Sequence, residues 1–240
     1  MPVKNLLLTC LPRDVYRRIE PDLKMVSLSR GEVLHRPGEE IHDLYFPTTC
    51  LISITVTMSG GQTAETGAVG RREAVGINAF MGGRETTQTE YIVQSPGEAL
   101  RIAADPLKEE FDRDKGLRDV MLKYTQALIA QLSQNVGCNR LHTIDERSAR
   151  WLLEVRERIE SDELLVTQEF ISEMLGVRRP GVTEVMRRLK EQGLIDYSRG
   201  HIQVINAHGL EAASCECYMV LKEEYDRLLG ERLWRGEAEC

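Results

Sequence analysis

The stretch from residue 164 to residue 205 limits the possible folds of this chain more than any other. It reads LLVTQEFISEMLGVRRPGVTEVMRRLKEQGLIDYSRGHIQVI. Apolar residues recur at steps of three and four on both sides of Gly176, which predicts two short helices. Thr167 can cap the first helix, and Gly176 can end it in a left-handed conformation. Pro180 fits the first turn of the second helix, where its missing N–H costs nothing.

The residues after the second helix predict a β-hairpin. Gly193 ends that helix, and LIDYSRGHIQVI reads as two strands joined around Arg199 and Gly200. A helix, a tight turn, a second helix and a hairpin follow one another in a winged helix-turn-helix. Because such domains insert their second helix into the major groove, DNA binding is the leading hypothesis.

The charge of the chain does not argue against DNA. The formal net charge is −7, yet residues 177–191 carry five basic side chains and two acidic ones. Attraction to phosphate is local, because salt screens charges over about 8–10 Å. In other respects the composition is ordinary for a globular protein, with 42% hydrophobic and 29% charged residues.

Residues 23 to about 104 predict an antiparallel sandwich or barrel. Short β-branched or aromatic segments alternate with turn signals such as Pro37-Gly38, Gly60-Gly61 and Pro96-Gly97. A short helix, LPRDVYRRIE, is expected before them. The candidate strands are KMVSL, EVLHR, DLYF, LISITVTM, EYIVQ and EALRI.

A long amphipathic helix is predicted between the two halves of the chain. Apolar residues from Leu117 to Val136 recur at steps of three and four and form one stripe. This stripe packs either on the chain's own sheet or on the same helix of a second subunit, and we favour the second subunit. The expected dimer contacts are Leu117, Met121, Tyr124, Leu128 and Leu132.

The complete order of elements resembles that of the Crp/Fnr family of bacterial transcription regulators. The most specific parts are VTQEFISEMLGVRRPGVTEVMRRLKEQGLI and GEVLHRPGEEIHDLYF, which is similar to the opening of a cyclic-nucleotide-binding domain. The resemblance covers residues from about 11 to 205. It implies an α+β chain with an N-terminal antiparallel β-roll (jelly roll) as sensor domain over residues 1–115. A dimerisation helix (116–142), a winged helix-turn-helix DNA-binding domain (143–207) and a C-terminal helical extension (208–240) would follow.

The resemblance also implies partners and a location. We expect a homodimer that binds double-stranded DNA at a two-fold-symmetric site, with RNA polymerase as a further partner. No apolar run approaches the roughly 20 residues of a membrane helix, and the first residues make a poor signal peptide. The expected location is therefore the cytoplasm, with no membrane partner.

The second helix of the predicted helix-turn-helix supplies the candidate DNA contacts. In the family, its N-terminal residues face base edges, and an arginine there can donate two hydrogen bonds to guanine. Pro180 and Glu184 depart from the glutamate and arginine of well-known members, so their operator sequence does not carry over. Arg187 and Arg188 could alternatively be a solvated face. Nearest the bases we expect Arg178, Arg179, Gly181 and Thr183, and nearest the phosphates Arg187, Lys190 and Arg199.

The segment that would bind cyclic AMP departs from the family pattern. Members that bind it carry Gly-Glu-Leu and, about eight residues later, Arg-Ser/Thr-Ala, whereas this chain reads VGINAFMGGRETTQTEYIV. Gly76 is kept, but Ile77 replaces the glutamate that accepts from the ribose. Thr87 and Gln88 stand where the phosphate-binding arginine and its neighbour belong, and Arg84 comes three residues early. We therefore expect no control by cyclic AMP. Gly76, Arg84, Thr87 and Gln88 are at most the pocket of another, unidentified effector.

No cofactor and no metal are expected from the sequence. Cys10 stands alone where iron–sulfur relatives have clustered cysteines, and the five histidines lack metal-ligand spacing. If the extension is one helix, Cys215 and Cys217 point to nearly opposite sides and cannot chelate together. Cys138 lies where the long helix meets the DNA-binding domain, and redox sensing through it is an alternative.

Enzyme activity is not expected, because the chain has no P-loop, no H-E-x-x-H and no G-x-S-x-G. A further alternative is a ligand-binding regulatory subunit that does not bind DNA. The extension could pack on its own DNA-binding domain or on a partner through an apolar stripe. That stripe comprises Leu210, Ala213, Cys217, Leu221, Tyr225 and Leu228.

Overall fold

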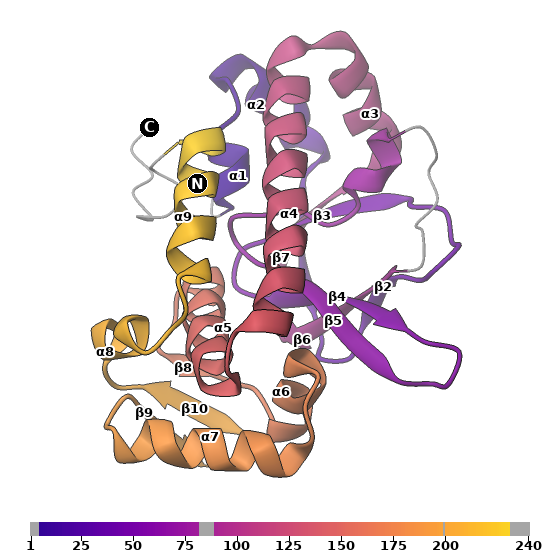
Figure 1. The fold of residues 1–240 in the computed structure, drawn as a ribbon. Helices are drawn as coiled ribbons and strands as arrows, with labels where there is room; N and C mark the ends of the chain where they lie inside the picture. The colour runs from indigo at the N-terminus through magenta and orange to yellow at the C-terminus, as the bar shows by residue number, and fades with distance from the viewer. Residues whose placement is uncertain (1–4, 82–88, 199, 231–240) are drawn as a thin grey trace.

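The structure is a computed structural model that describes residues 5–81, 89–198 and 200–230, apart from the side chain of Glu169. Figure 1 shows a β-roll, a long helix α4 along it, a small domain at one end of α4 and a helical extension that returns beside α4. The predicted α+β class and the order of its parts are confirmed. None of the described helices is long and apolar enough to span a membrane.

Two antiparallel sheets form the roll and enclose an apolar core. The three-stranded sheet has the order β1-β7-β3 and the four-stranded sheet the order β2-β6-β4-β5. All six predicted strands form, whereas β5, whose sequence TAETGAV has little apolar content, was not expected. The bounds are β1 Lys24–Leu28, β2 Val33–His35, β3 Asp43–Pro47, β4 Leu51–Thr57, β5 Thr63–Val69, β6 Thr89–Ser95 and β7 Gly97–Ala103.

Short helices precede and follow the strands of the roll, and one 3-10 turn, η2, lies between β5 and β6. They bury leucine, valine and phenylalanine side chains against the core between the sheets. The predicted leading helix is α2. The bounds are α1 Leu6–Thr9, α2 Arg13–Ile19, the 3-10 turns η1 Glu20–Asp22 and η2 Ile77–Phe80, and α3 Ala104–Arg113.

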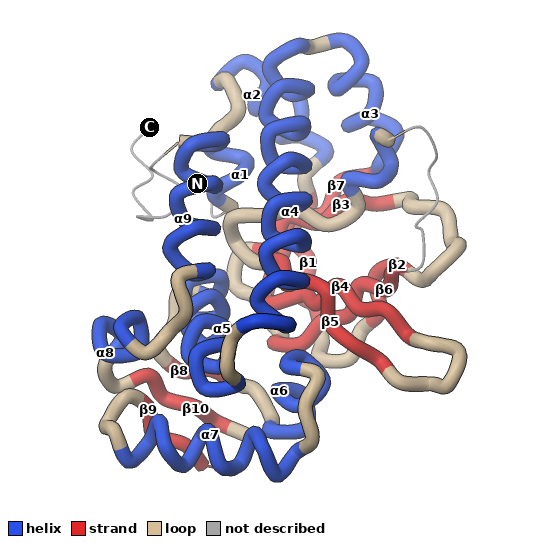
Figure 2. The backbone as a smooth tube through the Cα atoms, in the orientation of Figure 1, coloured by secondary structure: helices blue, strands red, loops and turns tan. Residues whose placement is uncertain are grey.

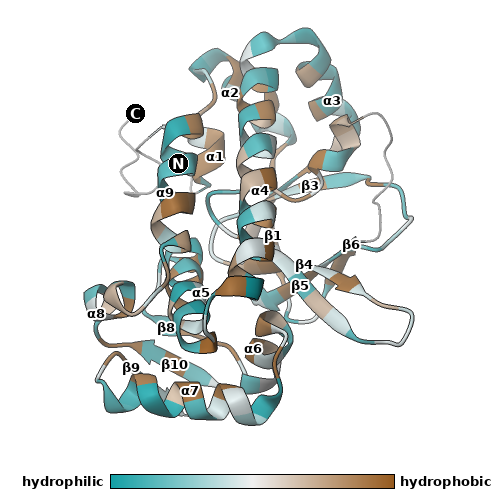
Figure 3. Ribbon diagram, in the orientation of Figure 1, coloured by the Kyte–Doolittle hydropathy of each residue, from teal (hydrophilic) through white to brown (hydrophobic). Residues whose placement is uncertain are grey.

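Helix α4, Lys115–Leu141, is the predicted long helix. Asp114 caps it by accepting a hydrogen bond from the backbone N–H of Gly116 at 2.6 Å, and this cap separates α4 from α3. One face of α4 lies on the roll, where the hydroxyl of Tyr124 donates to the carbonyl of Ala74 at 2.8 Å. Figure 3 shows polar and apolar positions alternating along its visible side.

The winged helix-turn-helix forms as predicted, with one additional strand. Thr143 and Glu146 make a reciprocal capping box at the start of the domain's first helix. Figure 2 shows the strands of the wing apart from those of the roll. The bounds are α5 Ile144–Ile159, β8 Glu163–Leu164, α6 Gln168–Leu175, α7 Arg179–Glu191, β9 Ile195–Ser198 and β10 His201–Val204.

The extension is two helices, so the condition of one continuous helix, under which Cys215 and Cys217 would point to opposite sides, does not hold. Helix α8 spans Ala207–Ala212 and α9 spans Cys217–Leu229, with an irregular turn between them. Helix α9 runs antiparallel beside α4 (Figure 1), and the hydroxyl of Tyr225 donates to Gln131 of α4 at 2.9 Å. The extension therefore packs on its own chain, with α8 against α5 and α9 mainly against α4.

Candidate functional site

Local signals set the angle between α6 and α7. Thr167 accepts a hydrogen bond from the backbone N–H of Phe170 at 3.2 Å, and Gly176 ends α6 with φ of 62°. Pro180 occupies the first turn of α7. These three sequence predictions are confirmed, and the turn between the helices leaves the N-terminal end of α7 at the surface.

The side chains expected to read bases lie together at this end of α7. Arg178 is the N-cap residue and Arg179 the first helical residue, and both are exposed. Neither has a carboxylate within ion-pair distance among the described residues. Thr183 is exposed one turn further along, and its hydroxyl donates to Gln168 of α6 at 2.9 Å. Gly181 is half-buried between them.

The basic residues further along α7 are engaged within the chain. Arg187 pairs with Glu184 at 2.7 Å and also contacts Glu191. Lys190 pairs at 2.5 Å with Asp196 of the wing. Arg199, the third expected phosphate contact, lies outside the described residues.

Arg188 has a different position from its neighbour. It donates two hydrogen bonds to the carboxylate of Asp145 on α5, at 2.7 and 2.8 Å. This bidentate contact ties α7 to α5 and fixes the helix whose N-terminus is exposed. From the sequence, Arg187 and Arg188 were both candidates for a solvated face, because the sequence does not show which of two adjacent residues faces a neighbouring helix.

The five residues expected to make the dimer contact lie on the wrong face of α4 for that role. Four of them are at most 7% exposed within the single subunit, and the fifth packs partly buried against the core of the roll. An apolar side chain already covered by its own roll cannot also cover a second subunit. The alternative, packing on the chain's own sheet, is therefore the one observed. It applies to Leu117, Met121, Tyr124, Leu128 and Leu132.

A different face of α4 exposes apolar side chains. Leu122, Ile129 and Val136 are 52%, 58% and 72% exposed. They recur every seven residues, the repeat of the seam between paired helices. The roll and α9 cover other faces of α4, so this face is open for a partner.

The expected effector pocket is only partly within the described residues. Gly76 has φ of 94°, and a Cβ there would lie 3.0 Å from the carbonyl oxygen of Asp43 and 3.3 Å from Nε2 of His35. Ile77, at the position of the family's glutamate, is 4% exposed and belongs to the core. Arg84, Thr87 and Gln88 lie outside the described residues.

The roll and the DNA-binding domain meet through buried charged side chains. Arg158, near the end of α5, pairs with Glu73 of the roll at 3.2 Å and with Glu154 at 3.0 Å. The backbone N–H of Arg71 donates to the carbonyl of Arg158 at 3.0 Å. A Cβ at Gly70 would overlap Arg158, so glycine permits this close approach.

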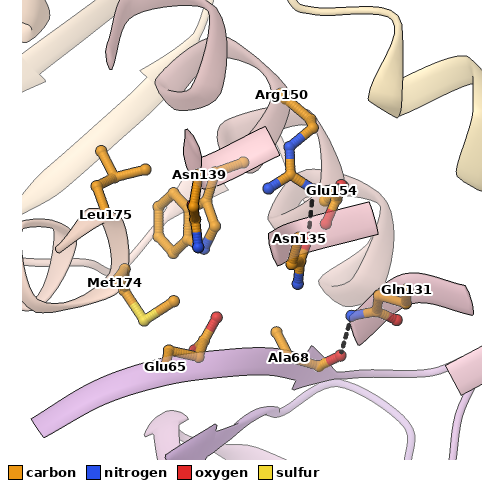
Figure 4. A pocket seen from close by; sticks show the side chains of 10 residues that line it. Glu65, Ala68, Gln131, Asn135, Asn139, Arg150, Glu154, Met174 and Leu175 are labelled. Carbon is orange, nitrogen blue, oxygen red and sulfur yellow. Dashed lines mark hydrogen bonds and ion pairs between the residues drawn. The ribbon is translucent and has the colours of Figure 1, made fainter. Parts of the chain in front are cut away.

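A small polar cavity lies at the same junction (Figure 4). Its volume of about 20 Å³ suits about one water molecule. Arg150 bridges Asn135 of α4 at 3.0 Å and Glu154 at 2.6 Å. Across the cavity, burial raises the pKa of Glu65 to about 8. The cavity connects β5, α4, α5 and α6 but has no room for a nucleotide.

Cys138 lies in a cluster that the sequence did not predict. Cys215 precedes α9 and Cys217 begins it, so the two thiols do not diverge as they would within one helix. Their sulfur atoms converge with Sγ of Cys138 and with the ring of His142, and all four ligand atoms lie within 4.8 Å of one another. A hydrogen bond with Cys215 lowers the pKa of Cys138 to about 5, with help from the Arg150 charge and against the effect of burial. The spacing of the histidines gives no sign of this cluster, because its members are distant in the sequence.

Comparisons with solved structures show the fold. FixK2 from Bradyrhizobium japonicum aligns with a TM-score of 0.69 at 15% identity, over 80% of this chain and 98% of that one. A CRP/FNR-family transcriptional regulator from Thermus thermophilus gives 0.63 at 19%, over 80% and 98%. The c-di-GMP-responsive global regulator CLP from Xanthomonas campestris gives 0.62 at 15%, over 80% and 99%. A search of the curated proteins finds no match.

Family models match both halves of the chain. The cyclic nucleotide-binding domain matches residues 25–114, and the Crp-like helix-turn-helix domain matches residues 146–213. Together they cover more than half of the chain, in the order that the sequence predicted. The chain belongs to the Crp/Fnr family of transcription regulators.

Proposed function

We propose that this regulator binds a specific two-fold-symmetric DNA site as a homodimer, in the cytoplasm and without cyclic AMP. The observation that carries the proposal is the pair Arg178 and Arg179. Both guanidinium groups are exposed at the N-terminal end of α7 and have no ion-pair partner among the described residues. Unpaired arginines at this end of a recognition helix are free to donate bidentate hydrogen bonds to guanine.

The remainder of α7 supports a positioning role. Arg187 and Lys190 are exposed, and their partners are exposed carboxylates. Exposed ion pairs contribute at most about 1 kcal/mol, so phosphates can displace these carboxylates at low cost. Contacts of this kind fix orientation on the duplex without reading its sequence.

The exposed face of α4 supports the homodimer. Leu122, Ile129 and Val136 form an apolar stripe at heptad spacing, and the same helix of a second copy would cover it. A two-fold axis beside α4 would present two copies of α7 to one DNA face. We place the dimer contact on these three residues.

The roll supports the proposal that the effector is not cyclic AMP. It would bind either another effector or no effector. Ile77 is buried in the core and offers no acceptor for a ribose hydroxyl. CLP, which has this fold, is described as responsive to c-di-GMP, so the fold does not imply cyclic AMP as its ligand. RNA polymerase is the further partner that we propose for the DNA-bound dimer.

Selection from a random duplex library with the purified chain tests the proposed function. We expect enrichment of a two-fold-symmetric motif whose half-sites lie about one helical turn, ~34 Å, apart. Enrichment without symmetry would contradict the dimer. Failure of the protein to shift any DNA, at any salt concentration, would favour the regulatory subunit that does not bind DNA.

Substitution of the two arginine positions separates base reading from phosphate contact. Arg179→Ala should weaken binding to the selected site by about 5- to 150-fold, equivalent to ~1–3 kcal/mol, and change the affinity for random DNA little. Arg187→Ala should weaken both DNAs equally and reduce the salt slope by about 1. Fluorescence anisotropy over a salt series measures both effects, with Arg227→Ala on α9 as the matched control. Equal losses on both DNAs for Arg179→Ala would refute base reading.

Titration calorimetry with cyclic AMP tests the effector proposal. No heat of binding is expected at micromolar ligand, because Ile77 cannot accept a hydrogen bond where the family pattern has glutamate. Ile77→Glu should not restore binding, since a buried carboxylate without a partner destabilises the roll. Micromolar affinity of the unaltered chain for cyclic AMP would overturn this part of the proposal.

A further inference from the structure

Four potential metal-binding side chains converge where α4 meets the extension. The sulfur atoms of Cys138 and Cys215 are 3.5 Å apart, and Sγ of Cys217 is 3.5 Å from Nδ1 of His142. The three thiols are at most 4% exposed. Three cysteines and a histidine are a common donor set for structural zinc.

The backbone explains why these side chains meet. Cys138 lies in the last turn of α4 and His142 is the C-cap residue four positions later, so both face the same side of the helix end. Cys215 lies in the irregular turn before α9, and Cys217 is the first residue of that helix. The turn brings both sulfur atoms of Cys-Glu-Cys toward α4.

The separations fit one tetrahedral ion. Zinc–sulfur bonds of about 2.3 Å and zinc–nitrogen bonds of about 2.0–2.1 Å place neighbouring ligand atoms about 3.5–3.8 Å apart in a tetrahedron. All four ligand atoms here lie within 4.8 Å of one another. An iron–sulfur cluster, with ligands on different iron atoms and sulfide between them, needs wider spacing. A disulfide between Cys138 and Cys215 would leave Cys217 and His142 unexplained.

The surrounding contacts are those of an outer ligand shell. Nε2 of His142 lies 3.1 Å from the Glu216 carboxylate, which leaves Nδ1 facing the thiols. Such a carboxylate fixes the ring and its tautomer in many zinc sites. Gln134 donates to Sγ of Cys217 at 3.1 Å, a contact that would stabilise a thiolate. Three thiolates and Zn²⁺ sum to −1, and the guanidinium of Arg150 lies close enough to interact with all three sulfur atoms.

We propose that Cys138, His142, Cys215 and Cys217 bind a single Zn²⁺ ion. The three cysteines would bind as thiolates, so binding would release to solvent the protons that their thiols still carry. The DNA-binding domain lies between the two ligand pairs in the sequence, with His142 before it and Cys215 after it. The ion would therefore fasten both ends of that domain to the end of α4. The site is separate from the DNA-contacting face of α7 and from the roll.

Metal analysis of the full chain, purified without an affinity tag under reducing conditions, tests the proposal. We expect about one zinc per chain in the wild type and in Cys10→Ser, whose thiol lies outside the cluster. Cys217→Ser should retain about a tenth of that or less after dialysis against a chelator. Circular dichroism establishes whether each variant is folded.

Cobalt substitution of the wild type gives a second answer that does not depend on a variant folding. Co²⁺ in a site with three thiolates should give strong thiolate-to-metal absorption that one equivalent of Zn²⁺ abolishes. A fully reduced wild type with neither bound zinc nor this absorption would overturn the proposal. So would iron with acid-labile sulfide, or equal zinc in Cys217→Ser and Cys10→Ser.

Discussion

Ile129→Glu should convert the protein to a monomer and lower its affinity for a two-fold-symmetric site by about 10²–10⁴-fold. Ile129 is the middle residue of the exposed stripe on α4, between Leu122 and Val136. In a dimer through this stripe, two glutamates would meet near the axis and lose their hydration without a cation to replace it. The two half-sites would then be bound independently by separate subunits, and the gain in affinity from linking the subunits would be lost.

The effect should be confined to assembly. Ile129 is 58% exposed in the single subunit, so the substitution removes little buried surface from it. Lys123→Glu is a suitable control, since Lys123 is also exposed but lies about 100° around the helix from Leu122. Sedimentation equilibrium measures the assembly, and anisotropy with one and two half-sites measures DNA binding. A wild type that is monomeric at all concentrations, or an Ile129→Glu variant that stays dimeric, would refute this placement of the contact.

The recognition helices were predictable because their signals are local. Thr167, Gly176 and Pro180 each act on the backbone within a few residues, and the structure has all three in the expected roles. The strands of the roll were found for the same reason, through β-branched runs between turn residues. Strand β5 was missed because its pairing with β4, and not its own composition, makes it a strand.

The face of α4 could not be chosen from the sequence. Periodicity identifies the most continuous apolar stripe, and in this chain the roll covers that stripe from Leu117 to Leu132 but leaves its last residue, Val136, exposed. The weaker stripe at Leu122, Ile129 and Val136 becomes visible only when the roll and α9 are in place. A helix that packs on both the roll and α9 can have more than one apolar face, and its sequence does not show which face meets which neighbour.

The cluster of three cysteines and a histidine was missed for a related reason. Its pairs are Cys138 with His142 and Cys215 with Cys217, separated by the entire DNA-binding domain. The error came from continuing a helix through Ser214, where the structure has a turn. The Cys-x-Cys motif before an apolar helix is the one local sequence signal of this cluster.

Arg158→Met should destabilise the folded chain by about 3–5 kcal/mol. Arg158 is 3% exposed and faces Glu73 from the roll and Glu154 from its own helix, at 3.2 and 3.0 Å. Methionine fills a similar volume but leaves these carboxylates buried with less positive charge nearby. Glu73 is on the roll and Arg158 is in the DNA-binding domain. Loss of their ion pair should therefore also weaken the contact between the roll and the DNA-binding domain.

The pH dependence distinguishes charge from packing in this variant. In the wild type, burial opposes ionisation of Glu154, but Arg150 and Arg158 hold its pKa below the usual value. Its stabilising contribution is therefore complete above the unfolded pKa of about 4.3 and is lost as the pH falls through the folded pKa. In Arg158→Met, burial with less positive charge favours the protonated carboxyl, so acidification should stabilise the variant. Urea unfolding should accordingly give a smaller difference in the free energy of unfolding between the wild type and the variant at pH 5 than at pH 7.5.

Arg156→Met is the control for this experiment. It removes only an exposed pair with Asp162 and should cost at most about 1 kcal/mol at both pH values. A difference for Arg158→Met that does not change with pH would mean that lost packing, and not buried charge, causes the destabilisation.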